Sequence, residues 1–311
     1  MEIFAPLEEL RHCNICPHSC NANRFSDKLG YCNADASFRI STICNHMGEE
    51  PVISGPKGIC NLFFTNCNLQ CTFCQNYQIS DNRLDHSDSI MDLDTIIRQI
   101  GYVLNMGMNI VGFVSPTHFT PHVKVIIKAM HEKGMKPTIV YNSNGYDKVD
   151  TLKSLEGMVD VYLPDFKYMD PGLAREYSGS GNYPEVALDA LREMYRQKGS
   201  TLVVDNEGYA MTGIVIRHLV LPGHKENSIQ VLKTIASEVS NNLHISLMSQ
   251  YHPNYRVHDH AKLGNTVSPK DYYKVVNTMS DLGFTRGWVQ EMSSAPYYLP
   301  DFRRKHPFES M

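Results

Sequence analysis

Three cysteines that could bind a metal lie close together in the segment FFTNCNLQCTFCQNYQIS (63–80). Cys67, Cys71 and Cys74 have the spacing C-x3-C-x2-C, and Phe73 directly precedes the last of them. Thiolates bind soft metals, in proteins chiefly zinc and the irons of iron–sulfur clusters. A cubane cluster normally takes four cysteines, so three would leave one iron open to a further ligand. The spacing predicts such a cluster, and a zinc knuckle completed by a distant histidine is the alternative.

A second group of cysteines lies near the N-terminus. Cys13, Cys16, Cys20 and Cys32 have the spacing C-x2-C-x3-C-x11-C. Four thiolates can close a metal site, and both zinc and a second iron–sulfur cluster fit this ligand set. A redox centre nearby would favour a cluster, because it could relay electrons. The other two cysteines, Cys44 and Cys60, are predicted to be packed thiols.

The composition excludes several classes of protein. The chain has 311 residues, 42% hydrophobic and 20% charged, with a net charge of −4. This balance is not basic enough for nonspecific nucleic-acid binding. The N-terminus lacks the features of a secretory signal, and no apolar run reaches the ~20 residues of a membrane helix. We therefore expect a cytoplasmic protein whose nine cysteines serve metal or redox chemistry rather than disulfides.

The elements that must position these cysteines alternate along the chain. Residues 1–56 are rich in cysteines and turns and are predicted to form a small metal-binding segment. Strand and helix patterns then alternate through residues 57–289, about six times, and a tail of residues 290–311 follows. Such alternation predicts parallel strands in an α/β fold, a partial (β/α)6 barrel of the TIM type, with a doubly wound open sheet as the alternative. The predicted strands are 59–64, 109–114, 137–142, 159–167, 212–223 and 244–251, and the predicted helices are 89–107, 121–134, 147–155, 183–199, 228–239 and 268–283.

The chain resembles the radical S-adenosylmethionine (SAM) superfamily, whose signature is C-x3-C-x-aromatic-C on a partial (β/α)6 barrel. Within it, the chain is similar to proteins related to pyruvate formate-lyase activating enzyme. The motifs that carry this likeness are CNICPHSC…GYC, GEEPVISG, FFTNCNLQCTFCQNYQIS, PTHFTPH, YLPDFKY, IRHLVLPG and ISLMSQY. The resemblance implies a [4Fe–4S] cluster on the three cysteines, with the amino and carboxylate groups of SAM on the open iron.

The resemblance also implies which side chains contact SAM. Phe73 would pack near the adenine. Where the family has an acidic residue after the second strand, VSPTHF offers the hydroxyls of Ser115 and Thr117, whose alternative role is to cap a helix. The other implied positions are Ser143 in SNG, Asp165 and Lys167 in DFK, Arg217 in IRHLVLPG and His252 in SQYHP.

The chemistry expected of these positions follows from their side chains. Asp165 and Lys167 would offer a carboxylate and an ammonium to the zwitterionic methionine group, with an exposed ion pair as the alternative. Arg217 would bind its carboxylate in a fork geometry. His252 would lie near the ribose, or else be a loop surface residue. The carboxylates of Glu49 and Glu50 in MGEEP (47–51) are predicted to be a capping or surface pair, with an interdomain or substrate-side role as the alternative.

The resemblance implies an enzyme that generates a 5′-deoxyadenosyl radical and abstracts hydrogen from a substrate. By analogy with the activating enzymes, the substrate would be a glycine of a partner protein, and a reductant such as flavodoxin or ferredoxin would supply electrons. Radical modification of a peptide or small metabolite is a second reading. A zinc-stapled interaction protein without catalysis is a third. No nucleic acid or membrane partner is expected, and no motif of the sequence is specific for a substrate.

Overall fold

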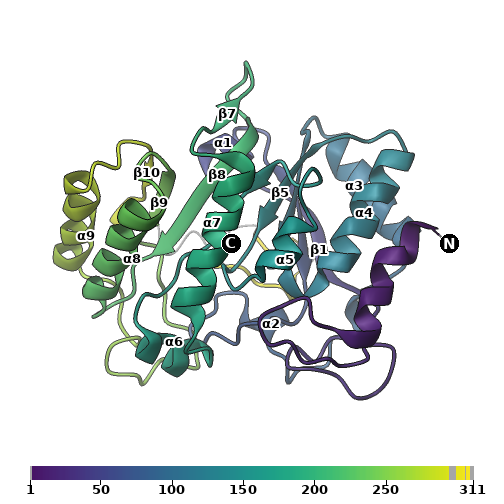
Figure 1. The fold of residues 1–311 in the computed structure, drawn as a ribbon, viewed down its shortest axis with the longest axis horizontal. Coiled ribbons are helices and arrows are strands. Elements are labelled where there is room, and N and C mark those ends of the chain that lie inside the picture. The colour runs from purple at the N-terminus through teal and green to yellow at the C-terminus, as the bar shows by residue number, and fades with distance from the viewer. Residues whose placement is uncertain (1, 294–298, 305, 309–311) are drawn as a thin grey trace.

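A computed structural model describes residues 2–293, 299–304 and 306–308 (Figure 1). Its parallel strands are β2 (Ile59–Phe64), β4 (Ile110–Val114), β5 (Thr138–Asn142), β6 (Val161–Tyr162), β8 (Ala210–Leu219), β9 (His244–Met248) and β10 (Gly287–Val289). They lie side by side in chain order, as expected for successive strand–crossover–strand units. Over the described residues the sheet does not close, because β10 and β3 (Ile90–Met91) are its two edges. The predicted partial barrel is confirmed, and β10 is a strand that the sequence analysis did not predict.

Helices connect the parallel strands and lie on the outside of the curved sheet (Figure 1). The longer ones are α3 (Leu93–Leu104), α4 (Thr120–Glu132), α6 (Pro171–Ser178), α7 (Tyr183–Lys198), α8 (Lys225–Glu238) and α9 (Pro269–Asp281). The N-terminal segment begins with η1 (Glu2–His12), a 3-10 helix of 11 residues. Short turns of helix are α1 (Pro51–Ser54), α2 (Tyr77–Ser80), η2 (Ser87–Ser89), η3 (Thr117–Phe119) and α5 (Val149–Lys153). The apolar spacing that predicted the first long helix corresponds to one buried face, with Ile96, Ile97, Ile100 and Val103 against the core.

Two predicted elements are longer than the observed ones, and a local feature explains each difference. The helix predicted over 89–107 begins only at Leu93, because the Asp92 side chain accepts a hydrogen bond from the Thr95 amide at 2.8 Å and caps it there. The residues before this cap form β3 instead. The strand predicted over 159–167 is only β6, because Pro164 has no N–H to continue the ladder. Sheet contact resumes beyond it as a single bridge between Asp165 and Arg217.

The N-terminal segment contributes a strand to the main sheet. β1 (Phe38–His46) pairs antiparallel with β2 along most of its length, and on its other side β3 pairs only with Phe38 and Arg39. Residues 1–56 are therefore joined to the barrel through backbone hydrogen bonds, and no gap in the sheet separates the two at residue 56. β7 (Val203–Val204) pairs with β8 in a hairpin that projects from the sheet (Figure 1). The division of the chain into segment, barrel and tail stays a prediction, and part of the tail lies outside the described residues.

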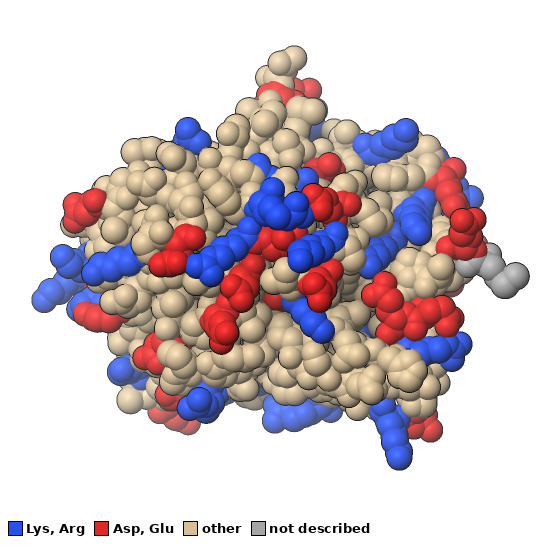
Figure 2. All heavy atoms as spheres, in the orientation of Figure 1, with Lys and Arg blue, Asp and Glu red and all other residues tan. Residues whose placement is uncertain are grey.

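Charges of both signs alternate on the face in Figure 2. Ion pairs of α7 include Arg192–Glu238 at 2.7 Å and Arg196–Glu156 at 2.6 Å. Side chains at these positions are about half exposed, so each pair contributes little to stability. Among the described helices, none has the length and apolar character required to cross a bilayer.

Candidate active site

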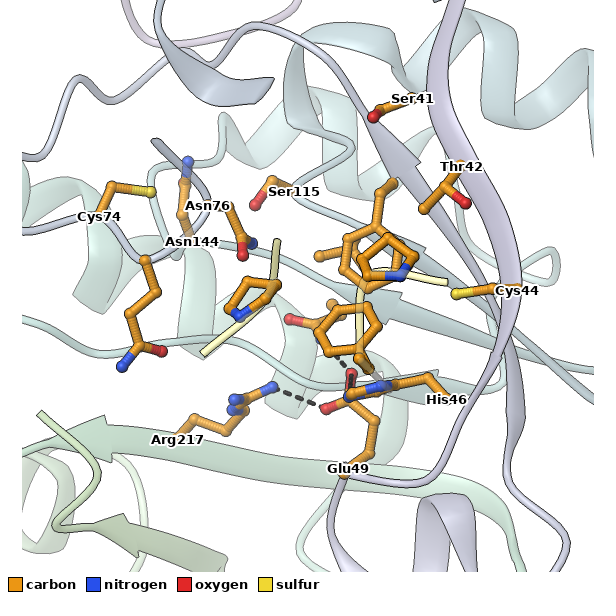
Figure 3. A pocket seen from close by; sticks show the side chains of 18 of the residues that line it. Ser41, Thr42, Cys44, His46, Glu49, Cys74, Asn76, Ser115, Asn144 and Arg217 are labelled. Atoms are coloured by element: carbon orange, nitrogen blue, oxygen red, sulfur yellow. Dashed lines mark hydrogen bonds and ion pairs between the residues drawn. The ribbon is translucent and has the colours of Figure 1, made fainter. Parts of the chain in front are cut away.

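A cavity of about 1000 Å³ opens at the carboxyl ends of the parallel strands (Figure 3). Cys67, Cys71 and Cys74 line it, on the loop that follows β2. Active sites of barrel folds occupy this end of the sheet, because the loops after successive strands meet there. The three cysteines therefore line one large cavity at this end of the sheet.

Hydrogen-bond donors are directed at the sulfurs of all three cysteines. The Cys67 sulfur accepts from the Leu69 amide at 3.3 Å and from Asn144 Nδ2 at 3.4 Å. Ser178 Oγ, at the end of α6, lies 3.0 Å from the Cys71 sulfur, and Ser80 Oγ lies 3.3 Å from that of Cys74. Burial raises the pKa of Cys67 and Cys71, whereas donors to sulfur favour the thiolate. This ligand set suits an iron–sulfur cluster, whose sulfur ligands are stabilised by such donors.

Opposite the cysteines, an ion network is built around Arg217 at the carboxyl end of β8. The Arg217 Nη1 atom lies 2.9 Å from Glu49 Oε2. Its Nε atom lies 3.6 Å from Glu50 Oε1 and 3.9 Å from Asp165 Oδ1. Figure 3 shows the Arg217–Glu49 pair pointing into the cavity. Burial disfavours the charge of Arg217, but the three carboxylates more than offset this and raise its pKa above the ordinary value. The guanidinium of Arg217 is therefore already paired with carboxylates of the protein before any ligand binds in the cavity.

The two glutamates correct one sequence interpretation. Glu49 and Glu50 are not a surface pair, because the side chains of both are only 6% exposed. Glu49 Oε1 also accepts from Asn61 Nδ2 at 2.8 Å and Asn142 Nδ2 at 3.3 Å. Burial raises the pKa of Glu50, and the nearby Arg217 charge opposes that shift. In the sequence, the only sign of this buried ion network was a pair of adjacent carboxylates between β1 and β2.

The predicted SAM contacts fall into two sets. Phe73, Ser115, Asp165, Lys167 and Arg217 all line the cavity. Lys167 Nζ pairs with Asp165 Oδ2 at 2.5 Å, and both side chains are largely buried, so this is not the exposed ion pair of the alternative reading. Burial lowers the pKa of Lys167, but the nearby Asp165 carboxylate and the cysteines raise it by more. The pKa therefore lies above its ordinary value, and Lys167 keeps its charged ammonium group.

The second set lies outside the cavity lining. Thr117 Oγ1 donates to Asp147 Oδ1 at 2.7 Å, and Ser143 Oγ donates to Asp147 Oδ2. These hydroxyls satisfy a fully buried carboxylate whose pKa is raised by burial. His252, on the loop after β9, is half-buried, and its Nδ1 lies 3.1 Å from the carbonyl oxygen of Pro253. Their proposed contacts with SAM remain predictions that would require these side chains to turn.

Sequence reasoning missed two parts of the cavity wall. One is the run Ser41 to Glu49, from β1 and the turn after it. The other is the C-terminal segment, where Phe308 packs its ring 4.1 Å from that of His46. The tail is fastened by Gln78, which donates to Asp301 Oδ1 at 3.0 Å. Alternating apolar and polar residues in FRISTICNH are the one sequence signal that could have placed a strand here.

A partial barrel with three cysteines after its first parallel strand defines a class of SAM-dependent iron–sulfur proteins. The sequence model of the Radical SAM superfamily matches residues 61–235, more than half of the chain. The chain belongs to the Radical SAM superfamily. Membership implies an enzyme, and generally a [4Fe–4S] cluster, SAM and a reductant.

Individual relatives are more distant. A Methanocaldococcus jannaschii protein, described as uncharacterized protein MJ0674, is 28% identical over 272 residues, covering 86% of this chain and 73% of its own. The crystal structure of HydG, a maturase of the [FeFe]-hydrogenase, matches with a TM-score of 0.52 at 14% identity, over 78% of this chain and 54% of HydG. A domain of pyruvate-formate lyase-activating enzyme from Bacteroides vulgatus matches 55% of this chain and 93% of that domain, at 14% identity and a TM-score of 0.39. The match to HydG shows the fold, and the chain covers about half of that protein's length.

Proposed function

We propose that this protein is a radical SAM enzyme of the activating-enzyme type, which abstracts a hydrogen atom from a glycine of a partner protein. When bound, the cluster and SAM would supply a 5′-deoxyadenosyl radical, formed with one electron from a reductant of the flavodoxin or ferredoxin class. The observation that carries the proposal is the extent of the cavity. It continues from the cysteines past Arg217 to the free edge of β1, and so has room for a substrate beside SAM.

The chain's own residues would divide the work between the two ends of this cavity. Cys67, Cys71 and Cys74 would hold the cluster, and the donors to their sulfurs would fix its orientation. Lys167 and Asp165 would bind the carboxylate and ammonium of the methionine group, because they offer both charges within one partly buried pair. The buried walls would exclude water from the radical.

The β1 edge favours a peptide as substrate. Nine consecutive residues, from 41 to 49, line the cavity. Side chains of a strand alternate between two faces, so an unbroken run of lining residues means that the strand presents its edge and backbone as well. Among the described strands, none pairs with this edge beyond Arg39. Unpaired N–H and C=O groups at such an edge can bind an extended peptide by adding a strand, which would deliver a backbone glycine.

Hydrogen transfer can be traced without knowing the partner. Cells of the source organism would be grown with glycine deuterated at Cα, and their extract would be separated into protein and low-mass fractions. Each fraction would be incubated anaerobically with reconstituted enzyme, dithionite and SAM. We expect deuterium in 5′-deoxyadenosine only with the protein fraction, by mass spectrometry.

The other outcomes each favour a rival function. Deuterium from the low-mass fraction alone would refute the activase proposal and favour a small metabolite. Transfer from protein grown with another deuterated amino acid, but not with glycine, would favour modification of a different peptide residue. Absence of any 5′-deoxyadenosine from fully reconstituted enzyme would favour a zinc-stapled interaction protein.

A further inference from the structure

The four N-terminal cysteines gather around one small cavity outside the candidate active site. Cys13, Cys16, Cys20 and Cys32 line it together with Arg24, Gly30 and His118. A bridge between Cys13 and Ala22 brings the chain back on itself, with the Cys13 amide 2.9 Å from the Ala22 carbonyl oxygen. Ser19 and Asn21 allow this turn through φ angles of 45° and 50°. The turn of this loop therefore brings Cys32 to the same cavity as the three cysteines that precede it in the sequence.

Backbone amides are directed at three of the four sulfurs. The Tyr31 amide donates to the Cys20 sulfur at 3.3 Å. The backbone of His18, two residues after Cys16, and that of Ala34, two residues after Cys32, lower the pKa of these thiols and so favour their thiolates. Leu69 and Cys67 show the same i, i+2 arrangement in the cluster loop of the active site. Such donors stabilise negative charge on sulfur, as metal-bound thiolates require.

Gly30 is required beside this group of sulfurs. A Cβ atom added at Gly30 would lie 2.8 Å from Cys20 Cβ and 2.9 Å from its sulfur. Both distances are shorter than van der Waals contact allows. The backbone therefore approaches Cys20 closely enough to hold its sulfur, and only glycine permits this.

A buried positive charge faces the same cavity. Arg24 is 2% exposed, and its guanidinium donates to carbonyl oxygens, those of Asp35 at 2.7 and 3.0 Å and that of His118. Over the part of the chain that the structure describes, Arg24 forms no ion pair with a carboxylate. A buried charge is costly unless an opposite charge compensates it. Four thiolates around a divalent ion, or around a [4Fe–4S]2+ cluster, would carry a net charge of about −2 and provide that compensation.

We propose that Cys13, Cys16, Cys20 and Cys32 bind a second metal centre, either zinc or an iron–sulfur cluster, which shares no ligand with the first. Throughout the described residues, no three Cys, His, Asp or Glu side chains converge closely enough to hold one ion. The same holds for Cys67, Cys71 and Cys74, which carry the cluster motif of the family. Convergence before binding is therefore not a criterion for a thiolate centre in this chain, and rotation of the side chains would bring the four sulfurs together.

The second centre is coupled to the loop that carries Cys67. His18 Nε2 lies 2.8 Å from the carbonyl oxygen of Asn68. Asn82 Nδ2 donates both to the Tyr31 carbonyl, at 3.0 Å, and to the Cys67 carbonyl, at 2.9 Å. Both bridges start one or two residues from a cysteine of the second group. Metal binding there would stiffen the segment that positions the first cluster.

The test is a metal count on the full chain. Protein would be reconstituted anaerobically with iron, sulfide and zinc. The content of each of the three per chain would then be measured. We expect either about eight irons or about four irons and one zinc. The variant with Cys13, Cys16, Cys20 and Cys32 all changed to alanine should retain about four irons and no zinc. The matched control Cys60→Ala, which removes a buried thiol from β2, should retain the full parent content.

A second measurement needs no variant. Cys20 is exposed, so it should react readily with N-ethylmaleimide unless a metal binds it. Peptide mass spectrometry would compare alkylation of Cys20 before and after removal of metal by a chelator. Protection in the loaded protein, lost on chelation, supports the second centre. A parent with about four irons and no zinc, or with Cys20 equally reactive in both states, overturns it. Neither result bears on 5′-deoxyadenosine formation, so this proposal fails separately from the proposed function.

Discussion

Replacing Lys167 by methionine should weaken SAM binding while leaving the cluster in place. The Lys167 ammonium lies 2.5 Å from Asp165 and lines the cavity beside the cysteines, and its side chain is 20% exposed. Methionine retains much of its volume but not its charge. Loss of one charge-assisted contact to the SAM carboxylate costs about 2 kcal/mol, which corresponds to about a 30-fold increase in Kd. Iron content should not change, because Lys167 is not a metal ligand.

Isothermal titration of SAM into anaerobically reconstituted enzyme would measure the Kd, with iron determined on the same samples. Lys57→Met is the matched control, because Lys57 also forms an ion pair, with Glu207 at 2.9 Å, but both side chains are exposed. Its loss should leave the Kd unchanged. A Lys167→Met enzyme that binds SAM within about threefold of the parent would refute the assignment. So would a loss of iron that accounts for the loss of binding.

Four further outcomes follow from the structure. Cys74→Ala should abolish 5′-deoxyadenosine formation with circular dichroism unchanged, and residual product would contradict the cluster assignment. Ser178→Ala should make the midpoint potential of the first cluster more negative in an EPR redox titration, whereas an unchanged potential would assign its hydroxyl to packing alone. Glu49→Gln should reduce the unfolding free energy by about 2 kcal/mol, which in a chain of this size lowers Tm by about 3 °C. An unchanged Tm would show that Glu50 and Asp165 are enough to compensate the charge of Arg217. His118 and His122 are buried with pKa lowered to about 3, so unfolding free energy should fall by about 1 kcal/mol per histidine from pH 7.5 to 5.5, and a pH-independent denaturation midpoint would contradict this.

The sign of that pH dependence follows from where protons bind. Between the ordinary histidine pKa of 6.5 and the folded value of about 3, the unfolded chain takes up protons that the folded chain excludes. Acid therefore favours unfolding through this window. Well above pH 6.5, from about pH 7.5, both states are nearly neutral at these histidines, and their contribution no longer changes.

What the sequence predicted well was encoded locally. The cluster cysteines lie within one loop, and the parallel strands appear as short apolar runs such as IVGFV, whose five residues are all buried. Both signals depend only on neighbours in the chain. The partial barrel and its metal-binding end were accordingly predictable before any coordinates were considered.

What was missed depends on contacts between distant segments. Glu49 is buried against Arg217, which is 168 residues away in the sequence, and a contact between residues so far apart leaves no local pattern. Ser178 reaches Cys71 only because α6 ends at the cavity, and α6 is too short to give a clear periodicity. The hydroxyls of Thr117 and Ser143 matched family motifs, yet both donate to the buried carboxylate of Asp147, which lies 30 residues from Thr117 in the sequence.

The distribution of the cavity wall over the chain bears on specificity. Residues 61–235, which match the superfamily, contain the cluster cysteines, Lys167 and Arg217, and these lie at the end where SAM would bind. The β1 edge, Glu49 and the C-terminal segment with Phe308 lie outside that range and form another part of the wall, which meets the first at the Arg217–Glu49 pair. On the proposed function, radical generation would require the first set, and the substrate would contact the second. Substrate choice in this protein should therefore vary with β1 and the tail, and exchanging these segments with a relative should change the substrate without changing SAM affinity.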